Sequence, residues 1–296
     1  MLQVRKLDWI AVGIFGAGLL FCASVPASAT TPQHQERHFT VKQRPLVVLQ
    51  NIVNGRIEVK SWKNSEVVVT STASSDKVAV DMEQVGDRID INASALASST
   101  QPHDVEANFQ LMVPEQTELQ LKTQTGLIYV EQVNGDMKLE SVAGDVHLKE
   151  VSGYIIVKTT GGSLICTLCS GKLLQFTSIS GGVQVLQPAL SNVNLMTMTG
   201  NILYDGDFVR TGSYYMDSGR GSLEVRFSGN DSFDLKAQTL LGSVDNQAAS
   251  FLKPEEHGIH HRPSMSRTLV VGTVGQGLAK VELKSYSGTI RILKRD

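Results

Sequence analysis

The sequence is poor in the residue types on which most ligand chemistry depends. Aromatic residues make up 6% of its 296 positions and charged residues 19%, with three cysteines and two tryptophans. The formal net charge is −2 and the basic residues form no stripe, which argues against a nucleic acid as the partner. So few aromatic rings also disfavour an extended stacking platform for sugars or bases.

The motifs of the common enzyme classes are absent from the sequence as well. It contains no G-x-S-x-G nucleophile elbow, no H-E-x-x-H zinc motif and no phosphate-binding loop. His103, Asp104 and Glu106 lie close together in a predicted loop, but in no catalytic spacing. We therefore expect neither an enzyme nor a cofactor. No helical period of useful length occurs either, which favours an all-β chain.

Residues 1–29 have the features of a secretory signal peptide. Two basic residues precede an apolar run at 10–23, and an A-x-A cleavage site follows at 27–29. The mature chain is then expected to begin at Thr30 and to carry no transmembrane segment. Two alternatives stay open: retention of the apolar run as a membrane anchor, and lipidation at Cys22, although the residue before it is bulkier than a lipobox prefers.

Glycine recurs at every ninth position through the middle of the chain. Apolar residues stand two and four positions after these glycines and two positions before them, with polar residues between. This spacing by two is typical of strands with one buried face. Glycine would form the corner after each strand, because a positive φ is cheap only without a Cβ. The glycines are Gly126, Gly135, Gly144, Gly153, Gly162 and Gly171, and the inward positions include Ile128, Val146, Leu164, Leu173 and Val142.

Such a short unit leaves no room for the helical crossover that joins parallel strands in a βαβ unit. Successive units must therefore turn and stack, as in a β-solenoid. We expect two units per coil, because the later glycines recur at twice the spacing of the first ones or slightly more. These later glycines are Gly182, Gly200, Gly221 and Gly242. A three-sided coil built from three units fits this spacing less well. The predicted fold is an all-β, single-stranded β-solenoid with about two short strands per coil.

The same patterns predict one β-solenoid domain over residues 45–296, preceded by a flexible segment at 30–44. A β-rich N-terminal cap would occupy the first part of the domain, because a bare end would expose unpaired strand edges. The strand pattern continues to the end of the chain, where Ile290 and Ile292 are expected to point inward. The predicted subdivisions are 45–122 for the cap, 123–246 for the regular repeats, 247–267 for a loop excursion and 268–296 for closing strands.

The recurring unit is Ser, Thr or Asn, then Gly, then one variable residue, then two apolar residues separated by one position. It occurs at Asn54–Val59, followed by Trp62, and at Thr125-Gly126, Ser152-Gly153, Ser180-Gly181, Thr199-Gly200 and Ser287-Gly288. In this pattern the chain resembles the bacterial "putative adhesin" domain-of-unknown-function family of exported β-solenoid repeat proteins. The resemblance covers nearly the whole mature chain. It implies an exported envelope protein that acts in adhesion or envelope-associated interactions, and it supplies no catalytic residues.

Cys166 and Cys169 form a C-x-x-C sequence inside the repeats. Both occupy positions that other repeats fill with inward-facing Val or Leu. Small core residues are therefore the favoured interpretation, with a structural disulfide as the main alternative. A redox pair is the least favoured, because no helix start is predicted here to lower a thiol pKa.

Two further groups of residues suggest metal binding. His257, His260 and His261 lie with two glutamates in the excursion, but the spacing H-x-x-H-H matches no zinc motif, so a solvated loop is the simpler interpretation. Gly135-Asp136 and Gly144-Asp145 resemble calcium-binding nonapeptide repeats. Only this pair of residues recurs, however, so we interpret the aspartates as corner residues.

These observations together predict a non-catalytic binding or scaffolding protein of the cell envelope. The periplasm is the leading location, with the cell surface or the extracellular medium as alternatives. The partner would be an envelope protein or a surface polysaccharide. A polysaccharide-acting β-solenoid enzyme and a periplasmic partner of an envelope-stress signalling system remain alternatives. The candidate contact residues are Tyr214, Tyr215, His257, His260 and Arg262.

Overall fold

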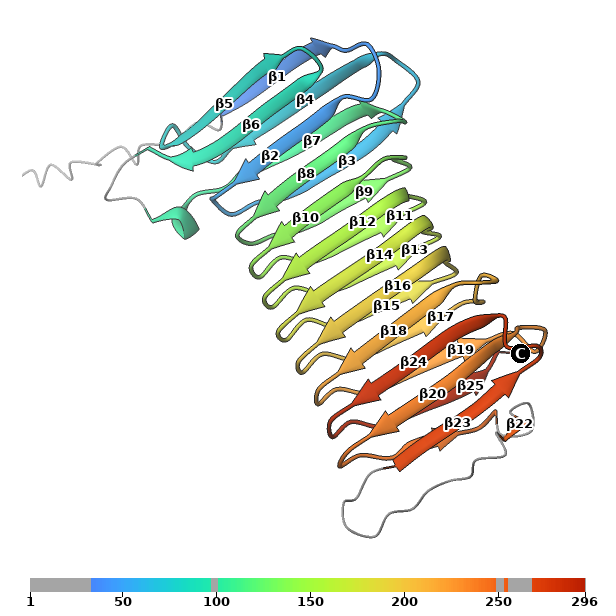
Figure 1. The fold of residues 1–296 in the computed structure, drawn as a ribbon. Helices are drawn as coiled ribbons and strands as arrows, with labels where there is room; N and C mark the ends of the chain where they lie inside the picture. The colour runs from blue at the N-terminus through green and yellow to red at the C-terminus, as the bar shows by residue number, and fades with distance from the viewer. Residues whose placement is uncertain (1–32, 97–100, 249–252, 255–267, 296) are drawn as a thin grey trace, which may run out of the picture. The chain divides into compact units, whose positions relative to one another are not determined.

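Two β-sheets face each other across a single apolar core in the computed structural model (Figure 1). The structure describes residues 33–96, 101–248, 253–254 and 268–295. Within these residues, sheet A has 12 strands and sheet B has 13. In the regular part of the stack, successive strands alternate between the two sheets, so each pass of the chain through both sheets makes one coil. The first regular coils are β8 (Glu118–Thr123), β9 (Ile128–Glu131), β10 (Met137–Ser141) and β11 (Val146–Lys149).

The coils stack in parallel and in register. Ile128 pairs with Val146 in the next coil, and Val146 pairs with Leu164 in the one after, so each coil contains two of the repeat units. All three side chains are fully buried. This confirms the predicted solenoid with two strands per coil. The stack continues through β12 (Ser152–Thr159), β13 (Leu164–Thr167), β14 (Ser170–Ser178), β15 (Val183–Leu186), β16 (Ala189–Thr197), β17 (Ile202–Asp205), β18 (Ser213–Ser218) and β19 (Leu223–Phe227).

The chain turns from sheet B to sheet A at corners that share the sequence hydroxyl-x-x-Gly. The hydroxyl side chain is buried, and in several corners it accepts a hydrogen bond from the amide of the glycine. Ser141 Oγ lies 2.7 Å from the Gly144 nitrogen, for example. We call these side chains the hydroxyl ladder. Its members are Thr123, Ser141, Thr159, Ser178, Thr197, Ser218, Thr239 and Ser285.

Close stacking of the coils explains why these corners carry glycine. A Cβ added at Gly144 would lie 1.9 Å from the carbonyl oxygen of Gly126, and one added at Gly162 would lie 1.9 Å from that of Gly144. No side chain fits in that space. The expected requirement for a positive φ is wrong for Gly135, Gly144 and Gly162, and holds for Gly126, Gly153 and Gly171.

The hydroxyl ladder also corrects the predicted orientation of Val142. This side chain was expected to point into the core, but it is 44% exposed. Ser141 takes the inward position instead, because its hydroxyl can satisfy the amide of the corner that follows. The alternation of inward and outward residues then places Val142 outside.

A β-bulge in β14 changes the register of the coils that follow it. Tyr154 pairs with Leu173 rather than with Lys172, so β14 contains one residue more than β12 at this point. Leu174 is therefore the buried residue, and the prediction that Leu173 points inward is wrong. The corner glycine moves in the same way, because Gly181 stacks on Gly162 where Gly182 was expected.

The N-terminal end of the stack is closed by antiparallel strands. β1 (Gln33–Thr40) pairs with β4 (Glu66–Ala73), so the prediction of a flexible segment at 30–44 is wrong for residues 33–40. The polar composition of this segment did not indicate a strand. The strand buries only Phe39, and its other side chains are largely exposed to solvent. The other cap strands are β2 (Leu46–Asn51), β3 (Ile57–Trp62), β5 (Val78–Val85), β6 (Arg88–Ala95) and β7 (Ala107–Pro114), with a short 3₁₀ helix at Pro102–Asp104.

An imidazole links β1 to β4. His38 Nε2 lies 3.0 Å from a carboxylate oxygen of Glu36, and Nδ1 lies 2.9 Å from one of Glu66. The hydrogen bonds to Glu36 and to Glu66 raise the pKa of His38 above 6.5. Protonation of this histidine therefore favours the pairing of the two strands.

The closing strands insert into the stack instead of ending it. β24 (Ala279–Ser285) lies between β18 and β20 (Phe233–Thr239), and β25 (Ile290–Lys294) lies between β19 and β21 (Val244–Asn246). Ile290 and Ile292 are buried, as predicted. β23 (Thr268–Val274) pairs with β20 and with the short β22 (Lys253–Pro254) at the end of sheet B.

Candidate functional site

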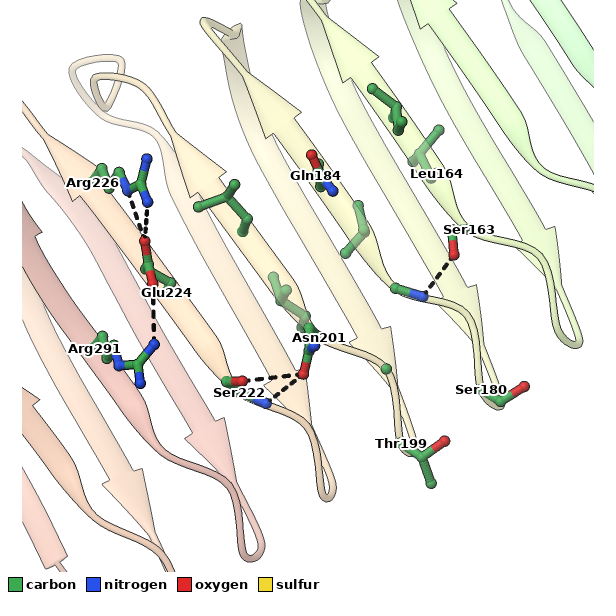
Figure 2. A pocket seen from close by; sticks show the side chains of 16 residues that line it. Ser163, Leu164, Ser180, Gln184, Thr199, Asn201, Ser222, Glu224, Arg226 and Arg291 are labelled. Atoms are coloured by element: carbon green, nitrogen blue, oxygen red, sulfur yellow. Dashed lines mark hydrogen bonds and ion pairs between the residues drawn. The ribbon is translucent and has the colours of Figure 1, made fainter.

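A groove of about 580 Å³ crosses the outer face of sheet A (Figure 2). Its lining comes from β13, β15, β17, β19 and β25, together with the corners that precede the first four of these strands. We call it the sheet A groove. Because neighbouring strands in a sheet are about 4.8 Å apart, the groove presents a regular series of side chains at that spacing.

One side of the groove consists of corner residues that are already fixed by hydrogen bonds. Asn201 Oδ1 accepts hydrogen bonds from the backbone nitrogen of Ser222 at 2.9 Å and from its hydroxyl at 3.1 Å. Gly182 donates its amide to Ser163 Oγ at 3.2 Å. Figure 2 shows these contacts bridging from one coil to the next. This wall is therefore polar and pre-organised.

The floor changes character along the groove. Ile165, Gln184 and Leu203 follow one another in register on the outer face, and the next two strands continue the row with Glu224 and Arg291. The floor is thus apolar or neutral at one end and charged at the other, which would give a bound chain a direction.

Glu224 is the one carboxylate among the described residues that line the groove. Arg226 Nε lies 2.7 Å from Glu224 Oε1, and Arg291 Nη1 lies 3.6 Å from Oε2 (Figure 2). Arg226 also lies 3.6 Å from Asp205, so this end of the groove carries a network of paired charges. Arg291 reaches the site only because β25 is inserted beside β19.

An interrupted row of exposed apolar side chains follows the corners on this edge of the solenoid. Ile179 and Met198 are on neighbouring coils, whereas Thr160 and Gly219 interrupt the row elsewhere. Each member directly follows a residue of the hydroxyl ladder, and the next residue after Ile179 and after Met198 lines the groove. We call this row the corner ridge: Val142, Ile179, Met198 and Tyr286, which are 44%, 54%, 62% and 53% exposed.

The sequence prediction named none of the residues that line the groove as contacts. Outward polar residues occur on every strand of the repeats, so the pattern alone does not single out one face. One sequence feature could have indicated this face. The position just before the first inward residue of a sheet A strand carries a short polar side chain in three of the coils: Ser163, Asn201 and Ser222. These side chains are short hydrogen-bonding groups on one edge of one sheet.

The structure corrects one predicted contact residue. Tyr214 was expected to be exposed, but it is 1% exposed and packs edge-on against Phe208 at 4.6 Å between ring centroids. Its hydroxyl donates to the Leu190 carbonyl and accepts from the Val209 amide, and burial raises its pKa. Tyr215 lies on the outer face of sheet B, with the Lys284 amino group 4.7 Å from its ring centroid.

Cys166 and Cys169 are both fully buried and are joined by a disulfide, with their Cα atoms 5.9 Å apart. The pair closes the corner between β13 and β14. Its burial leaves neither sulfur open to a redox partner at the surface. The disulfide that the sequence left as an alternative is thus the arrangement in the structure.

The aspartates of the Gly-Asp pairs make corner contacts. Asp145 Oδ1 accepts a hydrogen bond from the Ser163 amide at 2.8 Å, and Asp136 Oδ1 accepts one from the Tyr154 amide at 3.2 Å. Each carboxylate thus links one coil to the next. Within the residues that the structure describes, no cluster of three or more potential metal ligands is found.

Several predicted features lie outside the described residues. These are the signal peptide at 1–29 with Cys22, and the excursion residues His257, His260, His261 and Arg262. His103 and Asp104 are described; they are exposed, and their side chains lie 3.4 Å apart. Across the described parts of the chain, no helix has the length and apolar character needed to cross a membrane.

The coils, the hydroxyl ladder and the outer groove define a β-solenoid repeat protein. The sequence profile of the Toastrack DUF4097 family matches residues 32–293, and the chain therefore belongs to this family. A comparison with curated proteins finds no match.

Solved structures that are similar to this chain include proteins from three bacteria. They are a "putative adhesin" from Bacteroides fragilis (12% identity, TM-score 0.43, covering 88% of this chain and 97% of that one), a "putative cell adhesion protein" from Clostridium sporogenes (10%, 0.31, 90% and 100%) and a "putative lipid binding protein" from Parabacteroides distasonis (10%, 0.33, 89% and 97%). At such low similarity they carry no argument about function.

Proposed function

We propose that this protein is an exported, non-catalytic binding protein of the cell envelope. It would hold an extended partner, a surface polysaccharide or a segment of an envelope protein, along the sheet A groove. The observation that carries this proposal is the groove itself, which crosses successive coils and repeats its polar groups from strand to strand. An extended polymer has repeating groups of its own, so it can use many such contacts at once.

The electrostatics of the groove favour binding over hydrolysis. Glycoside hydrolysis normally requires two carboxyl groups on opposite sides of the bond that is cleaved. Among the described residues, Glu224 is the one carboxylate that lines the groove, and it forms ion pairs with Arg226 and Arg291. It has no acidic partner in the groove with which to share general acid and base roles. The alternative of a polysaccharide-acting enzyme is therefore less well supported.

The corner ridge enlarges the proposed contact area. Ile179 and Met198 stand next to Ser180 and Thr199, which line the groove. A partner lying in the groove can bury these apolar side chains, at about 25 cal/mol for each Å² removed from water. Polar contacts in the groove would then give direction and specificity, while the ridge would add affinity.

The proposed location follows from the N-terminal sequence. A cleaved signal peptide would place the mature chain in the periplasm, or beyond it at the cell surface. Buried disulfides persist in such oxidising compartments, which agrees with the Cys166–Cys169 pair. A role as a periplasmic partner in envelope-stress signalling would use the same surface for a protein segment.

A groove-filling substitution tests this proposal. Gln184 is exposed on the floor of the groove, and Gln110 is exposed on the outer face of the same sheet, in the N-terminal cap. Gln184→Arg should reduce co-sedimentation of the protein with isolated envelopes by at least tenfold, whereas Gln110→Arg should leave it unchanged. Equal binding by the two variants, with equal thermal stability, would overturn the proposal. Digesting the envelopes with protease, or with polysaccharide hydrolases, then identifies the partner's class.

A further inference from the structure

A second cavity, of about 550 Å³, lies in the N-terminal cap. It is formed where three connecting loops meet, at residues 41–45, 63–65 and 114–116, and Trp62 lines it at the end of β3. These loops connect β1 to β2, β3 to β4 and β7 to β8, outside the regular repeats.

Trp62 is held in place by the fold. Its Nε1 donates a hydrogen bond to the Glu66 carbonyl at 2.8 Å, and its backbone is in register with Pro114 of β7. The side chain is only half-buried, although it is the largest in the cavity lining. A ligand that packs on a ring already fixed in this way loses little side-chain entropy, which favours binding.

Cationic side chains from two of the loops gather at this cavity. Lys42, Arg44 and Lys63 line it and are exposed, whereas Glu115 is the one carboxylate in the lining. Arg44 lies 3.6 Å from Glu118, outside the lining. Among the described residues, no carboxylate lies within ion-pair distance of the amino groups of Lys42 and Lys63.

The remaining polar groups in the lining are neutral and suit hydroxyl groups. Gln43, Asn64 and Gln116 each supply an amide that can both donate and accept hydrogen bonds, and Ser65 adds a hydroxyl. A fixed indole, several amides and lysines without a carboxylate partner among the described residues are together suited to an acidic sugar. The indole face packs on the C–H face of a sugar ring, the amides bond its hydroxyls, and the cations bind an acidic substituent.

We propose that this cavity, the cap site, binds a sugar residue that carries a carboxylate or phosphate group, as part of an acidic polysaccharide. In this arrangement Trp62 supports the ring, while Lys42 and Lys63 neutralise the anion. The cap site lies apart from the sheet A groove and shares no lining residue with it. Its ligand therefore does not depend on what the groove binds.

The single indole makes the site directly measurable. The chain has two tryptophans, so the full chain with Trp9→Phe reports only on Trp62. This protein is titrated with oligogalacturonate as the carboxylate probe, glucose 6-phosphate as the phosphate probe and maltotetraose as a neutral control. We expect a saturable change in Trp62 fluorescence, matched by calorimetry, with an acidic probe at least tenfold tighter than the neutral one. Comparison of the two acidic probes identifies the preferred anion.

Substitutions then separate binding from folding. Lys42→Gln and Lys63→Gln should each weaken the acidic probe by about tenfold at low salt, whereas Lys280→Gln, an exposed lysine on sheet B, should not. Trp62→Phe should weaken binding measured by calorimetry while the protein stays folded. Gln184→Arg should leave it unchanged, so that failure in the groove and failure in the cap site remain distinguishable. No saturable response to either acidic probe, equal affinity for maltotetraose, or no effect of the lysine substitutions would overturn the proposal.

Discussion

Because the corner glycines are in close contact, we predict that one added methyl group at Gly162 destabilises the protein. In Gly162→Ala the added Cβ would lie 1.9 Å from the Gly144 carbonyl oxygen, whereas ordinary contact begins at 3.4 Å. The two coils must therefore separate locally by about 1.5 Å. The neighbouring residue offers a matched control, because a Cβ at Gly161 would meet nothing closer than 3.7 Å.

The cost can be worked out from the bonds that flank this corner. The Gly161 amide donates to the Val142 carbonyl at 2.8 Å, and the Val146 amide donates to the Ser163 carbonyl at 2.8 Å. Separation by about 1.5 Å breaks both, at about 1 kcal/mol each. Overpacking strain adds about 1–3 kcal/mol. Gly162→Ala should therefore lower the free energy of unfolding by about 3–5 kcal/mol.

The control variant, Gly161→Ala, should not lower the free energy of unfolding. Neither glycine has a positive φ, so neither substitution introduces torsional strain. Gly161→Ala should be neutral or should stabilise the protein by about 0.4–1 kcal/mol, because alanine restricts the unfolded chain. Urea unfolding followed by circular dichroism measures both variants. Equal midpoints for the two would refute the explanation of the corner glycines by close stacking.

Three further predictions concern the ladder, the disulfide and β1. Ser178→Ala should cost about 1–3 kcal/mol in urea unfolding because it leaves a buried corner amide unpaired, whereas the exposed Ser180→Ala should stay within about 0.5 kcal/mol; equal losses would contradict the ladder. Thiol titration of denatured protein should find two more thiols with reductant than without, from Cys166 and Cys169; equal counts would contradict the disulfide. Stabilisation of β1 by protonated His38 should be complete below pH 6.5 and lost as the pH rises through its raised pKa; amide exchange in β1, corrected for its intrinsic rate, should show this loss, and His38→Gln should remove it.

The two-stranded coil could be predicted from the sequence because each repeat unit is a short, continuous stretch of the chain. An apolar residue such as Val146 recurs once in every coil with a glycine two positions before it, and this is enough to set the strand, the corner and the step between coils. One error arose because the position two residues before the glycine was preferred to the strict alternation of the strand, which makes Met137, Leu139 and Ser141 the inward residues. Ser141 took the inward place for its hydrogen bond, and Val142 moved outside.

The order of the last coils could not be predicted in this way. β25 has the same local pattern as β19 and β21, and any of these strands could be a neighbour of any other. Their order depends on long-range packing, which no local period records. The charged end of the groove was missed for this reason, since Arg291 and Glu224 are separated in the sequence by several intervening strands.

The two candidate sites were missed for a related reason. Trp62 was noticed only as part of the repeat motif, and the lysines that join it in the cap site come from two separate loops. Tyr214 was expected at the surface together with its neighbour Tyr215. In the structure it packs against Phe208 and accepts a hydrogen bond from the Val209 amide, and so stabilises the connection between β17 and β18.

The insertion of β25 between β19 and β21 is the claim on which the charged end of the groove depends. Disulfide formation tests it directly, since Cα atoms on adjacent strands are about 5 Å apart and a disulfide spans at most about 7 Å. The pairs are Glu224→Cys with Arg291→Cys, which are adjacent, and Glu224→Cys with Asp245→Cys, which β25 separates. Mass spectrometry after mild oxidation should find the first pair bonded and the second free. A bond in the second pair but not the first would place β21 beside β19 and contradict the account.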